Sequence, residues 1–335
     1  MPKINTSTPK ILVIRFSSIG DIVLTTPVLR NLKRAFPEGE IHYFTKPAFS
    51  TVLKQNPYIT QIHELESPLA PQLQRLKAEN FDLILDLHHN LRSLRVKWAL
   101  GVPRISFYKA NLAKFLLVKT GRLPRPIPHI VDRYLDVLRK IGIQPDNAGL
   151  DFFLSKEAIT QAEVILKESG PAFSGDCLAV VLGATHRTKR WLPVHFTTML
   201  NRFRQPVILL GGPDIRKETN AIIGGLDIPI LDAVGKYDLM VSAALMKSCR
   251  AVLTHDTGLM HVAAAFGMKI FSIWGSTVPE LGMTPWKTES FILENTEIPC
   301  RPCTKIGFDV CPKGHFNCMG KLTPEKVLES LENNF

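Results

Sequence analysis

Two short segments of the chain concentrate hydroxyl and cationic side chains directly after apolar runs. The first is segment 183–191, GATHRTKRW, which contains Thr185, Arg187 and Lys189. Guanidinium groups form forked hydrogen bonds with phosphate oxygens, and ammonium groups act as mobile point charges. The segment therefore predicts a loop that binds an oxyanion. The alternative is a solvated basic loop that buries only Trp191.

The second segment, 254–261 (THDTGLMH), places a hydroxyl and a glycine at the expected start of a helix. Backbone N–H groups at a helix start bind phosphate, and Thr257 and Gly258 suit that role. His261 either donates to the same phosphate or is a buried histidine with protein partners. Asp256 is expected to cap the helix and to orient His261 or the loop.

Two carboxylates follow other apolar runs. In segment 17–21, Gly20 permits a tight turn and the close approach of another molecule. Asp21 either caps the following helix or acts as a general base on an acceptor hydroxyl, and this segment alone does not decide between them. Asp214 is a candidate for binding ribose hydroxyls.

The elements that must position these residues alternate between short apolar runs and amphipathic stretches, which is typical of parallel sheets covered by helices. The predicted strands are 11–16, 41–44, 83–87, 178–182, 207–210, 228–231, 251–254 and 270–273. The predicted helices are 22–36, 69–79, 92–99, 131–141, 194–204, 215–224, 239–249, 258–266 and 323–331.

This alternation occurs in two series, separated by a zone from 144 to 175 that contains prolines and glycines. We therefore predict an α/β protein with two doubly wound, Rossmann-like domains. The N-terminal domain spans 1–160, the second spans 176–320, and a C-terminal helix spans 321–335. Because ligands bind at the carboxyl ends of such strands, the two domains are expected to face each other across a cleft.

The charge of the chain is unevenly distributed. The formal net charge is +11, and segment 88–131 has nine Lys or Arg residues, no Asp or Glu, and interleaved apolar residues. This pattern suits an anionic lipid headgroup, a phosphorylated substrate or nucleic acid, and the alternative is a solvated basic face. No export signal or membrane-spanning run is found, so a cytoplasmic location is expected.

Some motifs are missing. No Gly-x-Gly-x-x-Gly follows the first predicted strand, which disfavours a dinucleotide oxidoreductase. No Gly-x-x-x-x-Gly-Lys-Ser/Thr is found either, which disfavours a P-loop phosphotransferase.

The chain resembles glycosyltransferase family 9, the lipopolysaccharide heptosyltransferases. The resemblance rests on ILVIRFSSIGDIVLTTPVLRNLK (11–33), GATHRTKRWLP (183–193) and LTHDTGLMHVAAAFGMKIFSIWGSTVPE (253–280), in this order. It implies a GT-B fold, in which the first domain binds the acceptor and the second binds the donor. It also implies an inverting transfer of heptose from ADP-heptose to the lipopolysaccharide inner core.

The resemblance also implies roles for individual residues. Asp21 and Lys189 are the expected catalytic residues. The expected donor-binding residues are Thr185, Arg187, Lys189, Asp214, Asp256, Thr257, Gly258 and His261. The expected acceptor-binding residues are Ser18, Gly20, Arg92 and Arg133.

This mechanism requires no cofactor and no catalytic metal, because fixed cations and backbone dipoles neutralise the departing diphosphate. The anionic acceptor suggests peripheral contact with the cytoplasmic face of the inner membrane, with no nucleic-acid partner. One alternative is a transferase of the same family that uses another nucleotide sugar. The other is a non-catalytic protein that binds anionic glycolipid or nucleic acid, although binding alone would not need a base such as Asp21.

The C-terminal part of the chain contains one set of residues with metal-ligand character. Four cysteines, with His315 in the last interval, could form a structural zinc site: Cys300, Cys303, Cys311 and Cys318. The alternatives are reduced thiols packed beneath a loop, or a disulfide pair.

Overall fold

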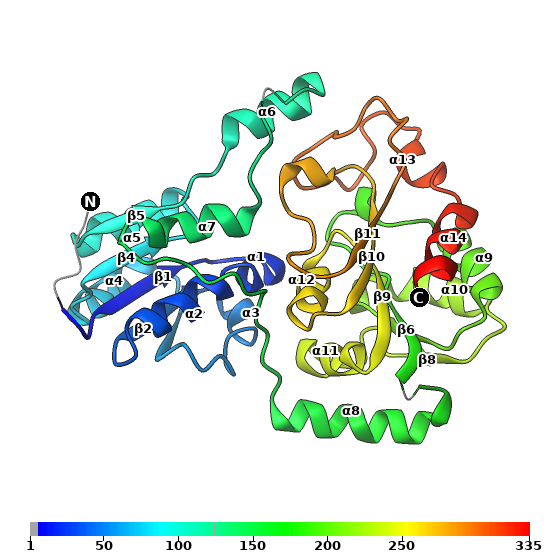
Figure 1. Ribbon diagram of the computed structural model, residues 1–335, viewed down its shortest axis with the longest axis horizontal. Helices are drawn as coiled ribbons and strands as arrows, with labels where there is room; N and C mark the ends of the chain where they lie inside the picture. The colour runs from blue at the N-terminus through cyan, green and yellow to red at the C-terminus, as the bar shows by residue number, and fades with distance from the viewer. Residues whose placement is uncertain (1–5, 124, 174) are drawn as a thin grey trace. The chain divides into compact units, whose positions relative to one another are not determined.

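The computed structural model describes residues 6–123, 125–173 and 175–335. The chain forms two compact units (Figure 1). The first unit comprises Met1–Lys109 and Pro128–Phe153, and the second comprises Ala110–Ile127 and Leu154–Phe335. In the described part of the chain, no helix is long and apolar enough to cross a membrane.

The first unit is built on a five-stranded parallel sheet with the order β3-β2-β1-β4-β5. Its strands are β1 (Lys10–Ile14), β2 (Glu40–Thr45), β3 (Gln61–Glu64), β4 (Leu83–Asp86) and β5 (Arg104–Ser106). Its helices are α1 (Ile19–Val23), α2 (Thr26–Ala35), α3 (Pro47–Ser50), α4 (Leu69–Ala78), α5 (Leu91–Leu100) and α7 (Ile130–Arg139).

The central strands of this sheet are buried on both faces, which explains their continuous apolar runs. On one face, Leu12 and Ile14 of β1 pack in a cluster with Leu76 of α4 and Val96 of α5. Such burial contributes roughly 1.5–3 kcal/mol for each large aliphatic side chain. The helices thus fix the sheet, and the sheet fixes the loops at its carboxyl edge.

The second unit contains a six-stranded parallel sheet with the order β11-β10-β9-β6-β7-β8. Its strands are β6 (Gly175–Val181), β7 (Val207–Leu210), β8 (Ile230–Asp232), β9 (Cys249–His255), β10 (Lys269–Trp274) and β11 (Ser290–Glu294). Its helices are α6 (Asn111–Thr120), α8 (Lys156–Ser169), α9 (Pro193–Phe203), α10 (Arg216–Ile223), α11 (Leu239–Lys247), α12 (Gly258–Ala265), α13 (Asn317–Gly320) and α14 (Pro324–Asn334).

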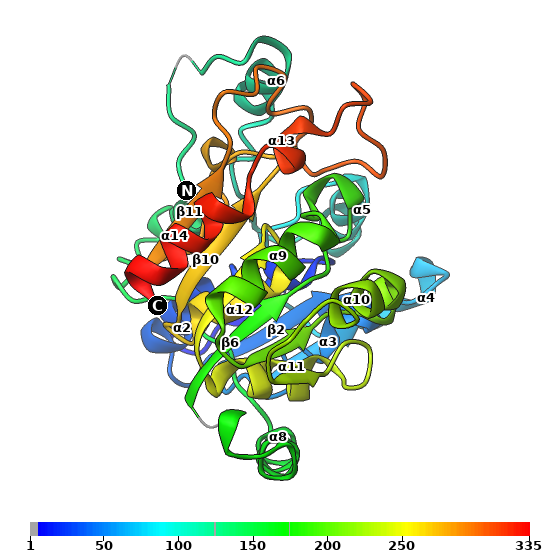
Figure 2. The same ribbon diagram turned by 90° about the vertical axis from the view of Figure 1, so that its right-hand side faces the viewer.

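Helix α14, the expected C-terminal helix, packs against α9 in the second unit (Figure 2). Its residues Val327 and Leu331 are fully buried in the same hydrophobic cluster as Leu200 of α9. The end of the chain is therefore part of the core of the second unit.

The structure corrects two expectations about local elements. The predicted helix over 22–36 is two helices, α1 and α2, because Pro27 has no N–H to donate to the Val23 carbonyl oxygen, which accepts from the Thr26 hydroxyl instead. The zone from 144 to 175 is not only a connection, since it contains α8, which packs against α11.

Candidate functional site

In the first unit, the segment after β1 forms the start of α1. Ser18 is the N-cap residue and Asp21 is the third residue of the helix. The backbone N–H and the Oγ of Ser18 donate to Asp21 Oδ2, at 3.2 and 3.0 Å. Arg15 Nη2 lies 2.7 Å from Asp21 Oδ1. The same carboxylate therefore completes a capping box and an ion pair, as the capping interpretation of Asp21 predicts.

The position of Arg15 is fixed by main-chain groups. Its Nε donates to the Ser17 carbonyl oxygen at 2.7 Å, and its Nη1 donates to the Leu87 carbonyl oxygen at 2.8 Å. Burial of the Asp21 carboxyl group opposes ionisation, but the charge of Arg15 and the hydrogen bonds from Ser18 outweigh it and lower the pKa of Asp21. Asp21 is therefore ionised at neutral pH, the state in which a general base accepts a proton. The Asp21 carboxylate can therefore cap α1 and also be in the state that a general base needs.

The residues expected to bind the acceptor differ in their environments. Ser18 and Gly20 lie in the first turn of α1, beside Asp21. The guanidinium of Arg92, on α5, lies over the ring of Phe16, with 5.9 Å from Cζ to the ring centroid. This contact places Arg92 near the loop that follows β1.

Arg133 has a different environment, since only 1% of its surface is exposed. Its guanidinium donates to the main-chain carbonyl groups of Tyr108, Lys109 and Pro128. These bonds hold the segment before α7 in place. A role for Arg133 in acceptor binding stays a prediction.

In the second unit, β6 and β9 are neighbouring central strands, so the loops at their carboxyl ends lie side by side. Lys189, after β6, places its Nζ 2.6 Å from Oδ2 of Asp256, after β9. The Lys189 and Asp256 side chains are only 14% and 12% exposed. Two segments identified separately in the sequence therefore meet through this ion pair.

Thr277 is a third member of this group, and sequence reasoning missed it. Its hydroxyl donates to Asp256 Oδ2 at 2.9 Å, and its side chain is almost completely buried. Thr277 follows β10, the strand next to β9. The available signals were its position shortly after a predicted strand and its place within segment 253–280, which carries the family resemblance.

The position of Lys189 also depends on its neighbour Thr188. The Thr188 hydroxyl lies 2.9 Å from Ser276 Oγ, donates to the Phe308 carbonyl oxygen at 2.8 Å and accepts from the Phe308 N–H at 2.8 Å. The Thr188 N–H also donates to the Phe308 carbonyl oxygen, at 3.0 Å. The loop after β6 is therefore tied to the end of β10 and to segment 300–318.

The other end of this loop is held by His255, the last residue of β9. The Trp191 N–H donates to His255 Nε2 at 2.9 Å. His255 is completely buried, and burial lowers its pKa to about 3. The imidazole is therefore neutral, as an acceptor nitrogen must be.

Helix α12 begins where the sequence predicts a phosphate-binding helix start. Its N-cap residue is Thr257 and not the expected Asp256, because the Asp256 carboxylate is bound by Lys189 and Thr277 instead. Thr257 Oγ1 lies 3.4 Å from Thr254 Oγ1. Gly258 is the first helical residue, and His261 is buried in the first turn. The early N–H groups of an α-helix have no intrahelical partner, so this end suits an anion.

The remaining donor candidates lie on the same edge of the sheet. Asp214 follows β7, and its Oδ2 lies 2.7 Å from Nη2 of Arg190. Thr185 and Arg187 are exposed in the loop after β6. Asp214 is 62% exposed, so its carboxylate is accessible to a ligand hydroxyl.

The four cysteines near the C-terminus are free thiols in this structure. Cys300 Sγ lies 3.8 Å from His315 Nε2. Burial and the neighbouring thiols raise the pKa of Cys303 to about 12. Among the described residues, the one group of three or more His, Cys, Asp or Glu ligand atoms within 4.8 Å of one another lies elsewhere, in the first unit. The structure therefore does not bring the four thiols together at metal-binding distances.

Comparisons with known proteins identify the family. The sequence model of glycosyltransferase family 9 (heptosyltransferase) matches residues 72–311. Lipooligosaccharide heptosyltransferase 2 of Haemophilus influenzae is 25% identical over 352 residues, which cover 96% of this chain and 98% of that protein.

Solved structures support the fold. A glycosyl transferase of family 9 from Veillonella parvula has a TM-score of 0.82 and 22% identity, and the match covers 98% of each chain. The ADP-heptose lps heptosyltransferase II of Escherichia coli has a TM-score of 0.74 and 20% identity, with 97% of this chain and 98% of that chain covered. The predicted GT-B class, with two Rossmann-like units, is thus confirmed.

The buried His255 predicts a pH dependence of stability. The unfolded state takes up a proton below the ordinary histidine pKa of about 6.5, whereas the folded state resists protonation down to about 3. This contribution to stability is complete above pH 6.5 and is lost as the pH falls toward 3, by up to about 1.4 kcal/mol per pH unit.

Chemical denaturation at pH 7.5, 6.5, 5.5 and 4.5 measures this loss. A His255→Asn variant is expected to be less stable at pH 7.5 but to lose less stability on acidification than the wild type. If the free energy of unfolding falls equally with pH in the two proteins, His255 is not the cause of the pH dependence.

Proposed function

The chain belongs to glycosyltransferase family 9, and on this basis we propose that it transfers heptose from ADP-heptose to the lipopolysaccharide inner core, with inversion. Two of the proteins named above are heptosyltransferases, and one of these is named for ADP-heptose. The observation that carries the proposal is the Lys189–Asp256 ion pair beside the start of α12. It combines a cation and free backbone N–H groups, which a departing diphosphate requires.

On the donor side, the proposal assigns the diphosphate to Lys189, Arg187 and the N–H groups of Thr257 and Gly258. Lys189 is held by Asp256 before the donor binds, so its ammonium group is positioned in advance. The negative charge that develops on the leaving oxygen strengthens these contacts in the transition state, which is the condition for catalysis. In the same proposal, Thr185 and His261 donate to phosphate oxygens and Asp214 accepts from the ribose hydroxyls.

On the acceptor side, the proposal gives Asp21 the role of the base that accepts the proton of the acceptor hydroxyl. The acceptor hydroxyl oxygen forms a bond with the anomeric carbon, its proton passes to an Asp21 carboxylate oxygen, and the bond from that carbon to the diphosphate breaks. ADP leaves with the electron pair of the broken bond. Because the pKa of Asp21 is low, it is a weak base in the ground state, so proton transfer is favoured only once the hydroxyl is already bonding to carbon.

A cleft in the first unit supports an anionic acceptor. Its volume is about 700 Å³, and three of its lining side chains are basic: Lys46, Arg92 and Arg95. Carboxylate and phosphate groups of an inner-core saccharide would form charge-assisted hydrogen bonds with these side chains. Glu66, on the cleft wall, offers an acceptor for sugar hydroxyls.

The same proposal includes peripheral contact with the inner-membrane surface from the cytoplasmic side. On α6, Leu112 is 70% exposed and Phe115 is 49% exposed, next to Lys114 and Lys119. Apolar side chains flanked by lysines suit an anionic lipid surface. This surface belongs to the acid-free segment 88–131.

Three further assignments stay open. A transferase of the same family that moves another nucleotide sugar would use the same residues. A non-catalytic binding protein for anionic glycolipid or nucleic acid would need the basic surfaces alone. A structural zinc ion at the four cysteines would require their thiols to move closer together.

Nucleotide specificity tests the donor. We expect ADP to raise the melting temperature of the protein by several degrees at concentrations about a hundred times its Kd, and UDP, GDP, CMP and NAD to raise it less. Lys189→Met should weaken ADP binding about tenfold or more, because it removes a charged hydrogen bond. Lys217→Met, at an exposed lysine on α10, is the matched control.

A larger thermal shift with UDP or GDP would leave the proposed mechanism unchanged, but the donor would then be a sugar carried by that nucleotide. No response to any diphosphate would contradict the proposed donor site and favour the binding protein.

Replacing the proposed base tests the acceptor side. Asp21→Asn keeps the shape of the side chain but cannot accept the proton, so kcat for heptosyl transfer should fall by roughly 10²–10⁴. The thermal shift caused by ADP should be unchanged, since Asp21 is not assigned to the donor. Turnover near the wild-type rate would remove Asp21 from the mechanism.

Vesicle flotation tests the membrane contact. We expect binding to vesicles with anionic lipid that weakens as salt is raised, and little binding to neutral vesicles. The double variant Leu112→Ser and Phe115→Ser should reduce this binding. Ile159→Ser with Val164→Ser, at comparably exposed positions of α8, is the control that should leave it unchanged. Equal binding to neutral vesicles would contradict the proposed surface.

A further inference from the structure

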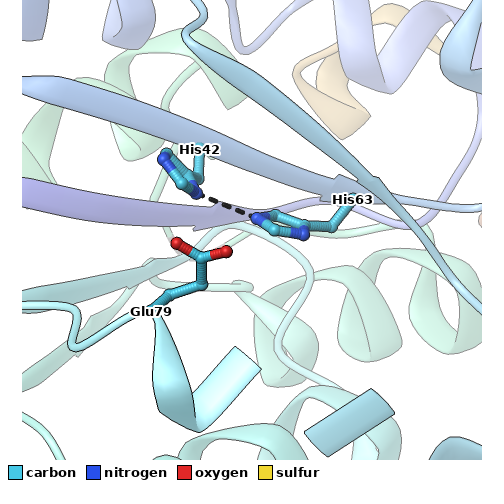
Figure 3. A group of neighbouring side chains, drawn as sticks. All are labelled: His42, His63 and Glu79. Carbon is cyan, nitrogen blue, oxygen red and sulfur yellow. Dashed lines mark hydrogen bonds between the residues drawn. The ribbon is translucent and has the colours of Figure 1, made fainter. Parts of the chain in front are cut away.

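A cluster of potential metal ligands lies in the first unit, where edge strand β3 meets β2 and the end of α4. His42 of β2, His63 of β3 and Glu79 after α4 offer two imidazole nitrogens and a carboxylate, all within 4.8 Å of one another. Figure 3 shows the two rings pointing toward each other, with the Glu79 carboxylate next to them. His42 Nδ1 lies 2.9 Å from His63 Nε2.

The geometry is close to that of a bound divalent ion. Zn²⁺ binds imidazole nitrogen and carboxylate oxygen at about 2.0–2.2 Å, so tetrahedral ligand atoms stand about 3.4 Å apart. The two nitrogens, now 2.9 Å apart, must separate by about half an ångström. The carboxylate, which lies within 4.8 Å of both, must approach by at most about 1.4 Å to reach this spacing. Rotation of the Glu79 side chain, which is 29% exposed, can supply the second movement.

A second carboxylate is placed to support one of the ligands. Glu40 Oε2 lies 3.2 Å from His42 Nε2, the ring nitrogen that does not face the cluster. With the Nε2 proton donated to Glu40, the Nδ1 lone pair of His42 is directed at His63 and Glu79. Metal-binding histidines generally donate their other N–H to a carboxylate in this way, which fixes the tautomer and makes the ligand nitrogen more basic.

Both imidazoles are in the state that metal binding requires. Burial lowers the pKa of His42, and burial together with the neighbouring His42 lowers the pKa of His63 to about 4. The rings are therefore neutral at neutral pH, so metal binding needs no net loss of a proton from either ring and requires only a change of tautomer in His63.

We propose that His42 Nδ1, His63 Nε2 and the Glu79 carboxylate form a binding site for a divalent transition-metal ion such as Zn²⁺ or Co²⁺. His63 moves its proton to Nδ1 when Nε2 binds, so the two rings keep one proton each. Water completes the coordination on the exposed side. The ion links edge strand β3 to β2 and to the end of α4.

This site is separate from the residues assigned to the transfer reaction. Lys10 and Glu40, next to the cluster, are the first residues of β1 and β2, whereas Asp21 follows the carboxyl end of β1. Substrates of such sheets bind at the carboxyl ends. The ion therefore acts on the stability of the first unit and not on the chemistry of transfer.

Lys10 competes with the ion. Its Nζ lies 3.1 Å from Glu40 Oε2 and 3.2 Å from Glu79 Oε2, so its ammonium group neutralises both carboxylates. An entering ion must displace Lys10 from Glu79 and then experiences its repulsion. Replacing Lys10 with an uncharged side chain should consequently strengthen metal binding, which a purely structural salt bridge would not predict.

Calorimetric titration of the folded, metal-free protein with Co²⁺ tests the proposal. We expect one ion per chain at this site, about tenfold or greater weakening in His63→Gln and in Glu79→Gln, and tighter binding in Lys10→Met. His315→Ala is the control, since His315 lies beside Cys300 and is not part of the cluster. Circular dichroism confirms that each variant is folded.

The absorption spectrum of bound Co²⁺ separates this site from the cysteines. Nitrogen and oxygen ligands give only weak visible bands, whereas thiolates add an intense near-ultraviolet charge-transfer band. The proposal expects the visible bands to disappear in His63→Gln and to persist in His315→Ala. Unchanged affinity in His63→Gln, weaker binding in Lys10→Met, or a thiolate band as the sole signal would overturn it.

Discussion

The ion pair between Lys189 and Asp256 is the interaction on which the candidate site of the second unit depends. It forms because β6 and β9 are hydrogen-bonded neighbours, so that the loops leaving their carboxyl ends lie next to each other. The strand order reverses at this place, since β7 lies on one side of β6 and β9 on the other. Parallel sheets bind ligands at such points because the flanking helices diverge there and leave room between the loops.

The first unit also has an ion pair at the carboxyl end of a central strand, but here the candidate catalytic group is the carboxylate and not the cation. β1 lies between β2 and β4, and the loop after β1 carries Asp21, held by Arg15. Arg15 reaches the Leu87 carbonyl oxygen at the end of β4, so the carboxylate is fixed to both central strands. One unit therefore presents a fixed anion at the carboxyl edge of its sheet, and the other presents a fixed cation.

Most of the buried strands and the helices that cover them could be predicted from local sequence patterns. Apolar runs predicted the buried strands, because parallel strands covered on both faces need continuous apolar sequence. Strands β3, β5 and β11 lie at the edges of their sheets and are only partly buried. Strands β3 and β5 contain no continuous apolar run, and the apolar run of β11 is only three residues long. Helix α8 buries just Ala158 and Ala162, so its apolar periodicity is weak, and the prolines and glycines around it favoured a connection instead.

The candidate residues could be selected from the sequence one by one, but the contacts between them could not. Asp21, Lys189 and Asp256 stand in recognisable motifs, whereas their pairing depends on which strands become neighbours. Thr277 supports Asp256 from a third strand, and no local pattern marks a single threonine for that role. The burial of Arg133 likewise depends on carbonyl groups of a distant loop.

The bonds between Thr188 and Phe308 also bear on the order in which the protein is completed during translation. The two residues are 120 positions apart in the chain. At about 5–20 residues per second, the ribosome makes the partner of Thr188 roughly 6–24 seconds after Thr188 itself. The loop that carries Lys189 therefore acquires this support only after Phe308 has been synthesised. A nascent chain stalled before Phe308 would contain every residue assigned to donor binding, including Asp256, the partner of Lys189, but it would lack the Phe308 contacts of the neighbouring Thr188.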